Sequence, residues 1–552
     1  MACVPCDGEE GAAICHRYVC DTILRRLHLQ PSRISVAPDF SARSVYQARL
    51  IGFLHQVIAP PLVLGHDRRP LKQARYSRPS EVGANRSIHF FFTPRRFLGH
   101  TSLSFPCKAQ DASCVYTDMI YMSSGKFGFL PTCLSVIALA AIFTTAWWLH
   151  PERAVSGFAV ANSHALPLAS KGPFYSTRFA SSDLDEFVHA SSVTSLPDGG
   201  LMAVWFAGSR EGAADVQVRG ARFDAIAAEW GEELVLATRE STQKATQKHI
   251  RKLGNPVIAL APDNRLWLFY VSVSIGGWAG SAINAMYSDD LGKTWSTPRQ
   301  LITTPFLNIS TLVRNAPVFH QDGTIGLPVY HEFLGKFAEY LYISPNGEVI
   351  GKSRISKGND SLQPTVVPMD EQHAVAMLRY AGASHHRVLA SRTADAGRTW
   401  SKPYPIDPAN PNSALAAVAT PNHGLLVALN DLEDGRFRLR LMETDSSLDL
   451  WKPVIDLDES PDPEGNPFTP EVYREIIGDK FRLSSGPRRL SLVDEFLTNL
   501  DKRVCKTHGC DFEYEYPYFI RSADGLYHLV YSWNNTFIKH VSFNDAWLLE
   551  QL

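Results

Sequence analysis

One eight-residue pattern occurs twice in this chain and limits what the chain can fold into. Residues 288–295 read SDDLGKTW and residues 393–400 read TADAGRTW, and each copy is followed by a serine and, two residues later, a proline. In a β-hairpin, the Asp and the Ser or Thr bond backbone amides of the turn, the Gly takes the positive-φ position, and the Trp holds the loop against the sheet. A turn motif that recurs about a hundred residues apart is typical of a fold built blade by blade.

The region from residue 174 to the C-terminus alternates short β-rich runs with turn dipeptides. Stretches such as SSVTSLPDGGLMAVWFAG and NPVIALAPDNRLWLFYVSV read as strand, turn and strand. The repeating unit is about sixty residues long, so residues 174–552 hold about six units. We therefore predict an all-β fold, a six-bladed β-propeller over residues 174–552.

One stretch, at about residues 456–512, breaks this pattern. Its VYREIIGDKFRL and LVDEFLTNLDKRV portions have helical spacing. Cys505 and Cys510 are close enough in sequence to close a small loop in an oxidising compartment. The stretch is predicted to be an insertion before the last blade, and it is either a lid beside the site or a packing element.

The N-terminal part has a different composition. Residues 129–149 carry no charge and include a pair of tryptophans near their end, so we predict a transmembrane signal anchor with an extracytoplasmic propeller. The alternative is a cleaved signal peptide and secretion. Residues 150–173 are then a linker. Residues 1–120 are rich in Arg, Ser and Pro and lack a helix or strand period, which predicts a low-order segment or an over-extended reading frame.

The repeated motif is similar to the Asp-box of sialidases. The chain resembles this sialidase (neuraminidase) Asp-box, or BNR-repeat, propeller family, and most of all its predicted bacterial-type neuraminidases. The resemblance implies a site on the propeller axis. Where the family has the first arginine of a carboxylate-binding triad, this chain has His189. The segment GSREGAAD matches the family's next arginine and its acid/base aspartate with Arg210 and Asp215, and Glu211 beside them is a further candidate for substrate contact.

The same resemblance identifies the remaining candidates. The second and third triad arginines correspond to Arg379 and Arg436, and the nucleophilic tyrosine corresponds to Tyr516. The glutamate that polarises this tyrosine corresponds to Gln363, which cannot accept the phenol's proton. The carboxylates that remain as replacement bases are Glu332, Glu513 and Glu515.

These residue types also fit a glycosidase site on chemical grounds. A glycoside hydrolase needs an acid that protonates the leaving oxygen and a second group that attacks or stabilises the anomeric centre. A tyrosine nucleophile avoids like-charge repulsion with a sugar that bears a carboxylate beside the anomeric carbon, and arginines bind that carboxylate. A histidine in one arginine position makes part of the site's charge depend on pH.

We therefore expect an exo-glycosidase that removes a terminal anionic sugar from glycoconjugates, with sialic acid as the first candidate. Two alternatives stay open: a hydrolase or lyase for a uronate-containing polysaccharide, and a glycan-binding propeller without turnover. The formal net charge of −2 gives no reason to expect a nucleic-acid partner. The sequence has neither metal-ligand spacing nor a glycine-rich cofactor loop, so we expect no metal and no cofactor. The expected partners are the terminal sugar of a glycan and, through one helix, a membrane. The oligomeric state is open.

Overall fold

A computed structural model describes residues 129–149, 155–160, 172–304, 308–358, 360–422, 424–485 and 491–552. All of them belong to the second of the two units into which the chain divides, residues 125–552. The low-order segment predicted at residues 1–120 lies outside the described residues.

The apolar run that precedes the propeller forms helix α3 (Phe129–Leu149). Within the described residues, however, no helix is both long enough and apolar enough to cross a membrane. The predicted transmembrane anchor at residues 129–149 is therefore not supported.

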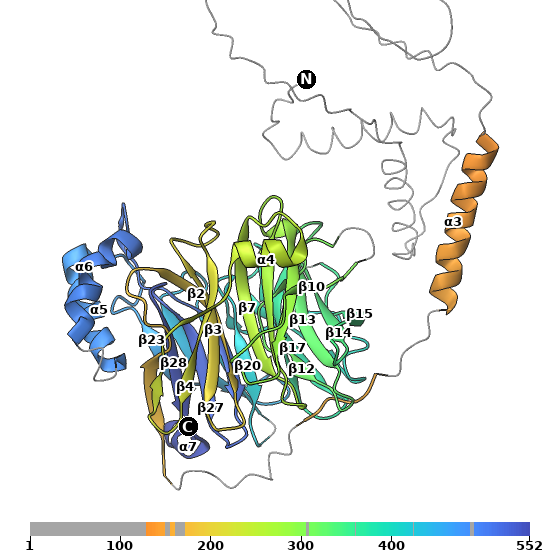
Figure 1. Cartoon of the computed structure of the whole chain (residues 1–552). Helices are drawn as coiled ribbons and strands as arrows, with labels where there is room; N and C mark the ends of the chain where they lie inside the picture. The colour runs from red at the N-terminus through yellow and green to blue at the C-terminus, as the bar shows by residue number, and fades with distance from the viewer. Residues whose placement is uncertain are drawn as a thin grey trace, which may run out of the picture. The chain divides into compact units, whose positions relative to one another are not determined.

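The rest of the described chain is dominated by six antiparallel sheets, which confirms the predicted all-β, six-bladed propeller (Figure 1). The first sheet consists of β2 (Phe187–Ser195), β3 (Leu201–Gly208), β4 (Gln217–Asp224), β5 (Glu229–Trp230) and β6 (Leu234–Ala237). The second consists of β7 (Lys252–Leu260), β8 (Leu266–Val273), β9 (Ser281–Ser288) and β10 (Arg299–Gln300). The third consists of β11 (Leu312–Val313), β12 (Val318–Phe319), β13 (Ile325–His331), β14 (Phe337–Ile343) and β15 (Val349–Arg354).

The other three sheets follow the same order along the chain. The fourth consists of β16 (Ser361–Pro368), β17 (Ala374–Tyr380), β18 (Arg387–Thr393) and β19 (Tyr404–Ala409). The fifth consists of β20 (Ala416–Ala419), β21 (Leu425–Leu429), β22 (Arg438–Thr444) and β23 (Trp451–Glu459). The sixth consists of β26 (Tyr514–Arg521), β27 (Tyr527–Trp533), β28 (Phe537–Phe543) and β1 (Tyr175–Phe179). Because β1 pairs with β28, the start of the propeller completes its last sheet.

The first strand of each sheet is its inner strand. In the third sheet the short strands β11 and β12 together take this inner position. Contacts run from β2 to β7, from β7 to β11, from β12 to β16, from β16 to β20, from β20 to β26, and from β26 back to β2. The inner strands therefore form a closed ring. The ring brings together residues near the starts of strands that are far apart in sequence.

The two copies of the turn motif have the predicted geometry. In the second copy, Asp395 accepts hydrogen bonds from Thr393 Oγ1 at 2.8 Å, Thr399 N at 2.8 Å and Thr399 Oγ1 at 2.6 Å. Gly397 has a φ of 87°, and the indole of Trp400 donates to the Gly397 carbonyl at 2.9 Å. The first copy repeats these carboxylate bonds at Asp290.

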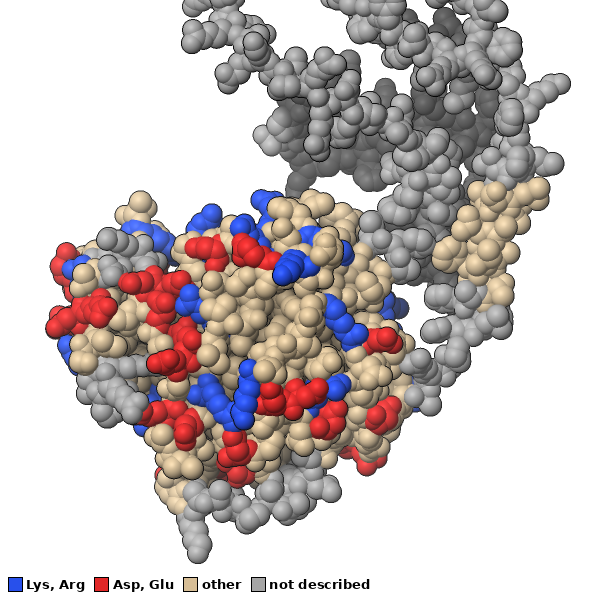
Figure 2. All heavy atoms as spheres, viewed as in Figure 1, with Lys and Arg blue, Asp and Glu red and all other residues tan. Residues whose placement is uncertain are grey.

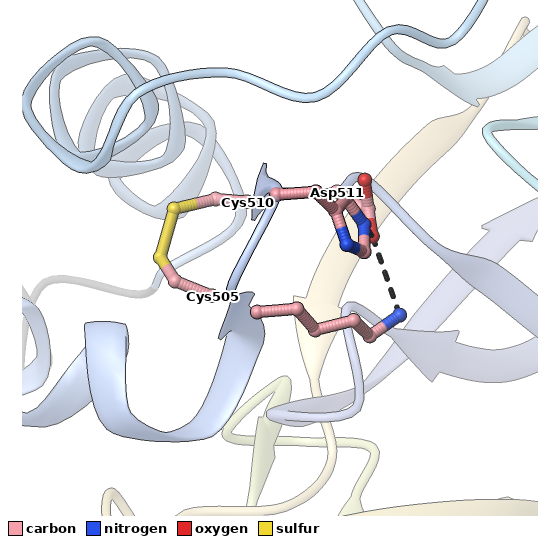
Figure 3. Close-up of a disulfide and its surroundings, with 5 residues drawn as sticks. Cys505, Cys510 and Asp511 are labelled. Atoms are coloured by element: carbon pink, nitrogen blue, oxygen red, sulfur yellow. Dashed lines mark hydrogen bonds and ion pairs between the residues drawn. A yellow bond between two sulfur atoms is a disulfide. The ribbon is translucent and has the colours of Figure 1, made fainter.

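The insertion at residues 456–512 contains α5 (Pro470–Ser484), α6 (Val493–Val504) and a two-stranded hairpin, β24 (Cys505–Lys506) and β25 (Gly509–Cys510). Cys505 and Cys510 form a disulfide, and the loop they close is tied to Asp511 by Lys506 (Figure 3). Apolar side chains of both helices share a core cluster with the last sheet; they are Tyr473, Ile477, Phe481, Phe496 and Leu500. This packing favours the second reading of the insertion, a packing element.

Smaller elements complete the described chain. They are α4 (Arg239–Thr246), the 3-10 helix η1 (Trp278–Gly280) and α7 (Asp545–Gln551). Within the predicted linker, residues 155–160 pack on the propeller, because Phe158 is fully buried and bridges to His320. On the face drawn in Figure 2, basic and acidic side chains are interspersed rather than gathered into fields of one sign.

Candidate active site

Four inner strands carry the same irregularity near their first residues. In β2, β7, β16 and β26 the pairing register shifts within the strand, and a residue other than glycine takes a positive φ at the shift. These residues are Ala190 (53°), Asn255 (44°), Gln363 (48°) and Tyr516 (53°). Such bulges re-aim side chains, and a left-handed backbone at a residue with a side chain is costly, so both features concentrate at functional sites.

Tyr516 lies against His189, which comes from the neighbouring sheet. Their ring centroids are 4.4 Å apart in an edge-to-face arrangement. His189 Nε2 is 3.4 Å from a carboxylate oxygen of Glu515, and Glu515 is buried and also forms an ion pair with Arg436. Glu515 precedes the β26 bulge and Tyr516 lies in it. Through these two residues β26 contacts His189 of the first sheet and Arg436 of the fifth.

The contacts continue from Arg436 around the ring. Arg436 donates to the backbone carbonyl of Asn412 at 3.0 Å, and Arg379 donates to the Asn412 side-chain oxygen at 2.6 Å. Arg379 also donates to Gln363 Oε1 at 3.2 Å. The hydroxyl of Tyr330 accepts from Gln363 at 3.4 Å and from Asn255 at 3.1 Å.

We call this connected set the axial cluster, and each of the six sheets or its adjoining loops contributes to it. Its members are His189, Asn255, Tyr330, Gln363, Arg379, Asn412, Arg436, Glu515 and Tyr516. Of the predicted site residues, it contains His189, Gln363, Arg379, Arg436 and Tyr516.

The two arginines of the cluster differ in how their charge is balanced. Burial by itself raises the pKa of Glu515, but the charges of His189, Arg436 and Arg379 outweigh it and hold that pKa below the usual value. Glu515 is therefore ionised and neutralises much of Arg436. Arg379 is held by the neutral side chains of Asn412 and Gln363, and within the described part of the chain it forms no ion pair with a carboxylate. Its charge is available to a ligand.

Glu332 lies next to the cluster, directly after β13. Burial raises the pKa of the Glu332 carboxyl, against the opposing charges of Arg379, Lys336 and Lys252. Burial likewise lowers the pKa of Lys252, against the charge of Glu211. A carboxylate with a raised pKa is a stronger proton acceptor than one with the ordinary value.

The hydrogen bonds of Asn535 determine the proton position on His189. Asn535 Nδ2 donates to Glu513 at 2.9 Å, so its Oδ1 faces His189 Nδ1 at 2.7 Å. Because an amide oxygen only accepts, Nδ1 carries a hydrogen. His189 Nε2 is then the ring nitrogen that faces Glu515.

Arg210, Glu211 and Asp215 lie in the exposed loop between β3 and β4. Asp215 accepts from Ser209 N at 3.1 Å and from Ser209 Oγ at 3.0 Å. In the described structure, no hydrogen bond or ion pair connects Arg210 or Asp215 to the axial cluster. The loop enters at the same end of the sheet as His189, because β2 begins where β3 ends.

A comparison with protein families shows which domain family the propeller belongs to. The model of the BNR repeat-like domain matches residues 199–529, more than half of the chain. The chain belongs to the BNR repeat-like domain family. The predicted relationship to Asp-box propellers is thereby confirmed.

Similar solved structures have low sequence identity to this BNR repeat-like propeller. The Hadza microbial sialidase Hz136 has a TM-score of 0.47 and 13% identity, over 64% of this chain and 65% of that one. A protein of unknown function from Dyadobacter fermentans has a TM-score of 0.49 and 12% identity, over 68% of this chain and 100% of that one. A variant of the NanB sialidase from Streptococcus pneumoniae has a TM-score of 0.47 and 9% identity, over 69% and 71%.

The BNR repeat-like chain thus spans less than two thirds of the length of the Hadza sialidase. No curated protein matches the sequence. At these identities, the solved structures say nothing about the substrate.

Several residues of the BNR repeat-like site were not predicted from the sequence. They are Asn255, Tyr330 and Asn535. One available signal is proline inside a strand, since Asn255, Gln363 and Tyr516 each precede a proline. Proline lacks an N–H and is found within sheets mainly at edges and bulges. The described residues contain no group of three or more His, Cys, Asp or Glu side chains that would hold a metal ion.

Proposed function

We propose that this protein is an exo-glycosidase that removes a terminal anionic sugar from a glycan, with sialic acid as the first substrate to test. The observation that carries the proposal is the joint presence, in one connected cluster, of a half-buried tyrosine and an arginine without a carboxylate partner. Tyr516 supplies a neutral nucleophile, and Arg379 supplies the charge for a sugar carboxylate.

Gln363 supports the binding role of Arg379. Its side-chain oxygen accepts from Arg379 at 3.2 Å and orients the guanidinium. A glutamate at this position would do the same but would also neutralise the arginine. The glutamine therefore leaves Arg379 without an ion pair in the described part of the chain, whereas Arg436 is paired with Glu515.

The proposed reaction has two displacements. The Tyr516 oxygen bonds to the anomeric carbon as the glycosidic bond breaks, its proton passes to Glu332, and Asp215 protonates the leaving oxygen. Water then displaces the tyrosine from the anomeric carbon and gives a proton to Asp215, Glu332 returns its proton to the Tyr516 oxygen, and the free sugar is released. The raised pKa of Glu332, caused first by burial, favours its service as a proton carrier.

The test is a hydrolysis screen with sialosides, uronosides and rhamnosides. We expect turnover of a sialoside, and a loss of about a hundredfold or more in kcat for Tyr516→Phe. Tyr404→Phe is the matched control, because Tyr404 is an exposed tyrosine of β19 outside the axial cluster. Arg379→Met should raise KM for anionic glycosides far more than for neutral ones. Full activity of Tyr516→Phe would refute the proposed nucleophile.

One observation favours a second candidate, a lyase for a uronate-containing polysaccharide. His189 and Tyr516 are in ring contact, and such a pair can take a proton from the carbon beside a carboxylate and return one to the leaving oxygen. Arg379 would again hold the carboxylate. A lyase leaves an unsaturated sugar that absorbs in the ultraviolet, whereas a hydrolase does not. Binding of these glycans without either product would instead support a glycan-binding propeller.

We further propose that the propeller works outside the cytoplasm. The Cys505–Cys510 disulfide supports this location, since disulfides persist mainly in oxidising compartments. Thiol labelling of protein taken from cells without a reductant tests it. Labelling of both cysteines would contradict the proposed location.

A further inference from the structure

Arg314 is a buried cation that the proposed reaction does not use. It follows β11 directly, and only 1% of its surface is exposed. Of the carboxylates in the described chain, none forms an ion pair with it, and its Nε has no hydrogen-bond partner there. Burial of a charge without an opposite charge is expensive. A position that keeps such a charge calls for a function.

The hydrogen bonds of Arg314 go to the backbones of two other inner strands. Nη1 donates to the Ser191 carbonyl of β2 at 3.1 Å, and Nη2 donates to the Pro517 carbonyl of β26 at 3.2 Å and to the Tyr516 carbonyl. The guanidinium thus donates to the carbonyl groups of two successive residues in the β26 bulge, Tyr516 and Pro517. It holds Tyr516 in the left-handed conformation, with a φ of 53°.

The side chains that face Arg314 are phenols. Its guanidinium carbon lies 5.1 Å from the ring centroid of Tyr516 and 5.9 Å from that of Tyr518. Burial lowers the pKa of Arg314 to about 10, with Tyr516, Tyr518 and Tyr330 opposing the shift. Tyr518 and Tyr330 are buried. Tyr516 is therefore the one phenol of the three that is partly open to solvent.

We propose that Arg314 is the positioning residue that aims and activates Tyr516. Its hydrogen bonds fix the bulge that directs the phenol into the axial cluster, and its charge beneath the ring stabilises the negative charge that develops as the proton leaves. The role rests on the proposed function of Tyr516 as a nucleophile. The role also explains how the site can work with Gln363 in the position where a carboxylate base is expected. A base favours loss of the phenol proton by accepting it, and the fixed charge of Arg314 favours the same loss by stabilising the phenolate.

Arginine suits this role better than lysine does. Its planar fork bonds carbonyls on two strands while its face stacks on an aromatic ring. Lysine would retain the charge without the fork. Arg314→Lys should therefore show an intermediate defect, and Arg314→Met should show the full one.

The first test measures the reactivity of the phenol without any substrate. The full chain is treated with N-acetylimidazole, which acetylates tyrosine oxygens, and the acetylation rate of Tyr516 is followed by peptide mass spectrometry. We expect Tyr516 to react about tenfold or more slowly in Arg314→Met, with Arg314→Lys between. Arg521→Met is the matched control, because Arg521 lies on the same strand as Tyr516 and, like Arg314, stacks on a tyrosine, here Tyr527 at 5.2 Å. Equal rates in folded wild type and both Arg314 variants would overturn the proposal.

The second test is a double-mutant cycle on kcat with Tyr516→Phe. If Arg314 acts through Tyr516, Arg314→Met lowers kcat in the wild type but not in the Tyr516→Phe background. Equal losses in both backgrounds would indicate a purely structural role and refute the proposal. Where no glycoside is turned over, the proposed function fails, and the acetylation rates still decide the role of Arg314.

Discussion

Replacement of Asp395 by alanine tests whether the repeated turn motif stabilises the propeller through its carboxylate. Asp395 accepts three hydrogen bonds, two from Thr399 and one from Thr393. A sheltered hydrogen bond to a charged group contributes about 1.5–3 kcal/mol; because the turn is half exposed, we take about 1 kcal/mol for each. We expect Asp395→Ala to lower the free energy of unfolding by about 3 kcal/mol.

Urea unfolding followed by tryptophan fluorescence measures this loss. The midpoint should fall while the slope stays the same, since the surface exposed on unfolding does not change. Asp289→Ala is the control, because Asp289 is an exposed carboxylate with one surface ion pair, to Arg265 at 2.8 Å. Its expected cost is below about 1 kcal/mol. Asp395→Asn should lie between the two, because the amide keeps one acceptor oxygen.

The effect also has a defined pH dependence. Burial opposes ionisation of Asp395, but the hydrogen bonds from Thr399 and Thr393 outweigh it and lower its pKa in the folded state. A lowered folded pKa means that the stabilisation is present above the unfolded value, about 3.9, and is lost as the pH falls further. The gap between wild type and Asp395→Ala should therefore narrow below about pH 4. A loss no larger than that of Asp289→Ala at neutral pH would refute the reasoning.

Three further predictions follow from other parts of the structure. Burial lowers the pKa of His528 to about 4 and that of its partner His540 well below the usual value. The contribution of this pair to stability should therefore be full above about pH 6.5 and fall as the pH drops toward 4, and melting temperatures across that range will measure it. Asp215→Asn should lower kcat on a cleaved glycoside by about a hundredfold with an unchanged melting temperature, and an unaffected rate would remove Asp215 from the acid role. Cys505→Ser should cost about 2 kcal/mol of unfolding free energy from the small loop that the disulfide closes, and an unchanged urea midpoint would show that the disulfide adds nothing.

Much of the fold could be predicted because its signals are local. The Asp, Thr, Gly and Trp of each turn motif interact within eight residues, so their spacing is visible in the sequence. The alternation of β-rich runs and turns predicted six sheets for the same reason. The resemblance to the family also singled out His189, Gln363, Arg379, Arg436 and Tyr516, all of which the structure brings into one cluster.

The ion pairs and contacts of those side chains could not be predicted from the sequence. Nothing in the sequence around Glu515 shows that it pairs with Arg436 and faces His189, and it was one of three carboxylates considered as a base. The apolar run at residues 129–149 predicted a helix correctly, but the anchor inferred from it is not supported. Residues 155–160 resemble a linker in sequence, yet Phe158 is buried against His320.

The sequence by itself determined the hairpins, because each turn is stabilised by bonds between residues only a few positions apart. Only the tertiary structure decided which charges meet, because the closed ring places residues from six sheets side by side. Arg314 shows the difference. Its neighbours Ser191 and Tyr516 are separated from it by more than a hundred residues, and only ring closure leaves its guanidinium buried beneath a phenol without a carboxylate to balance it.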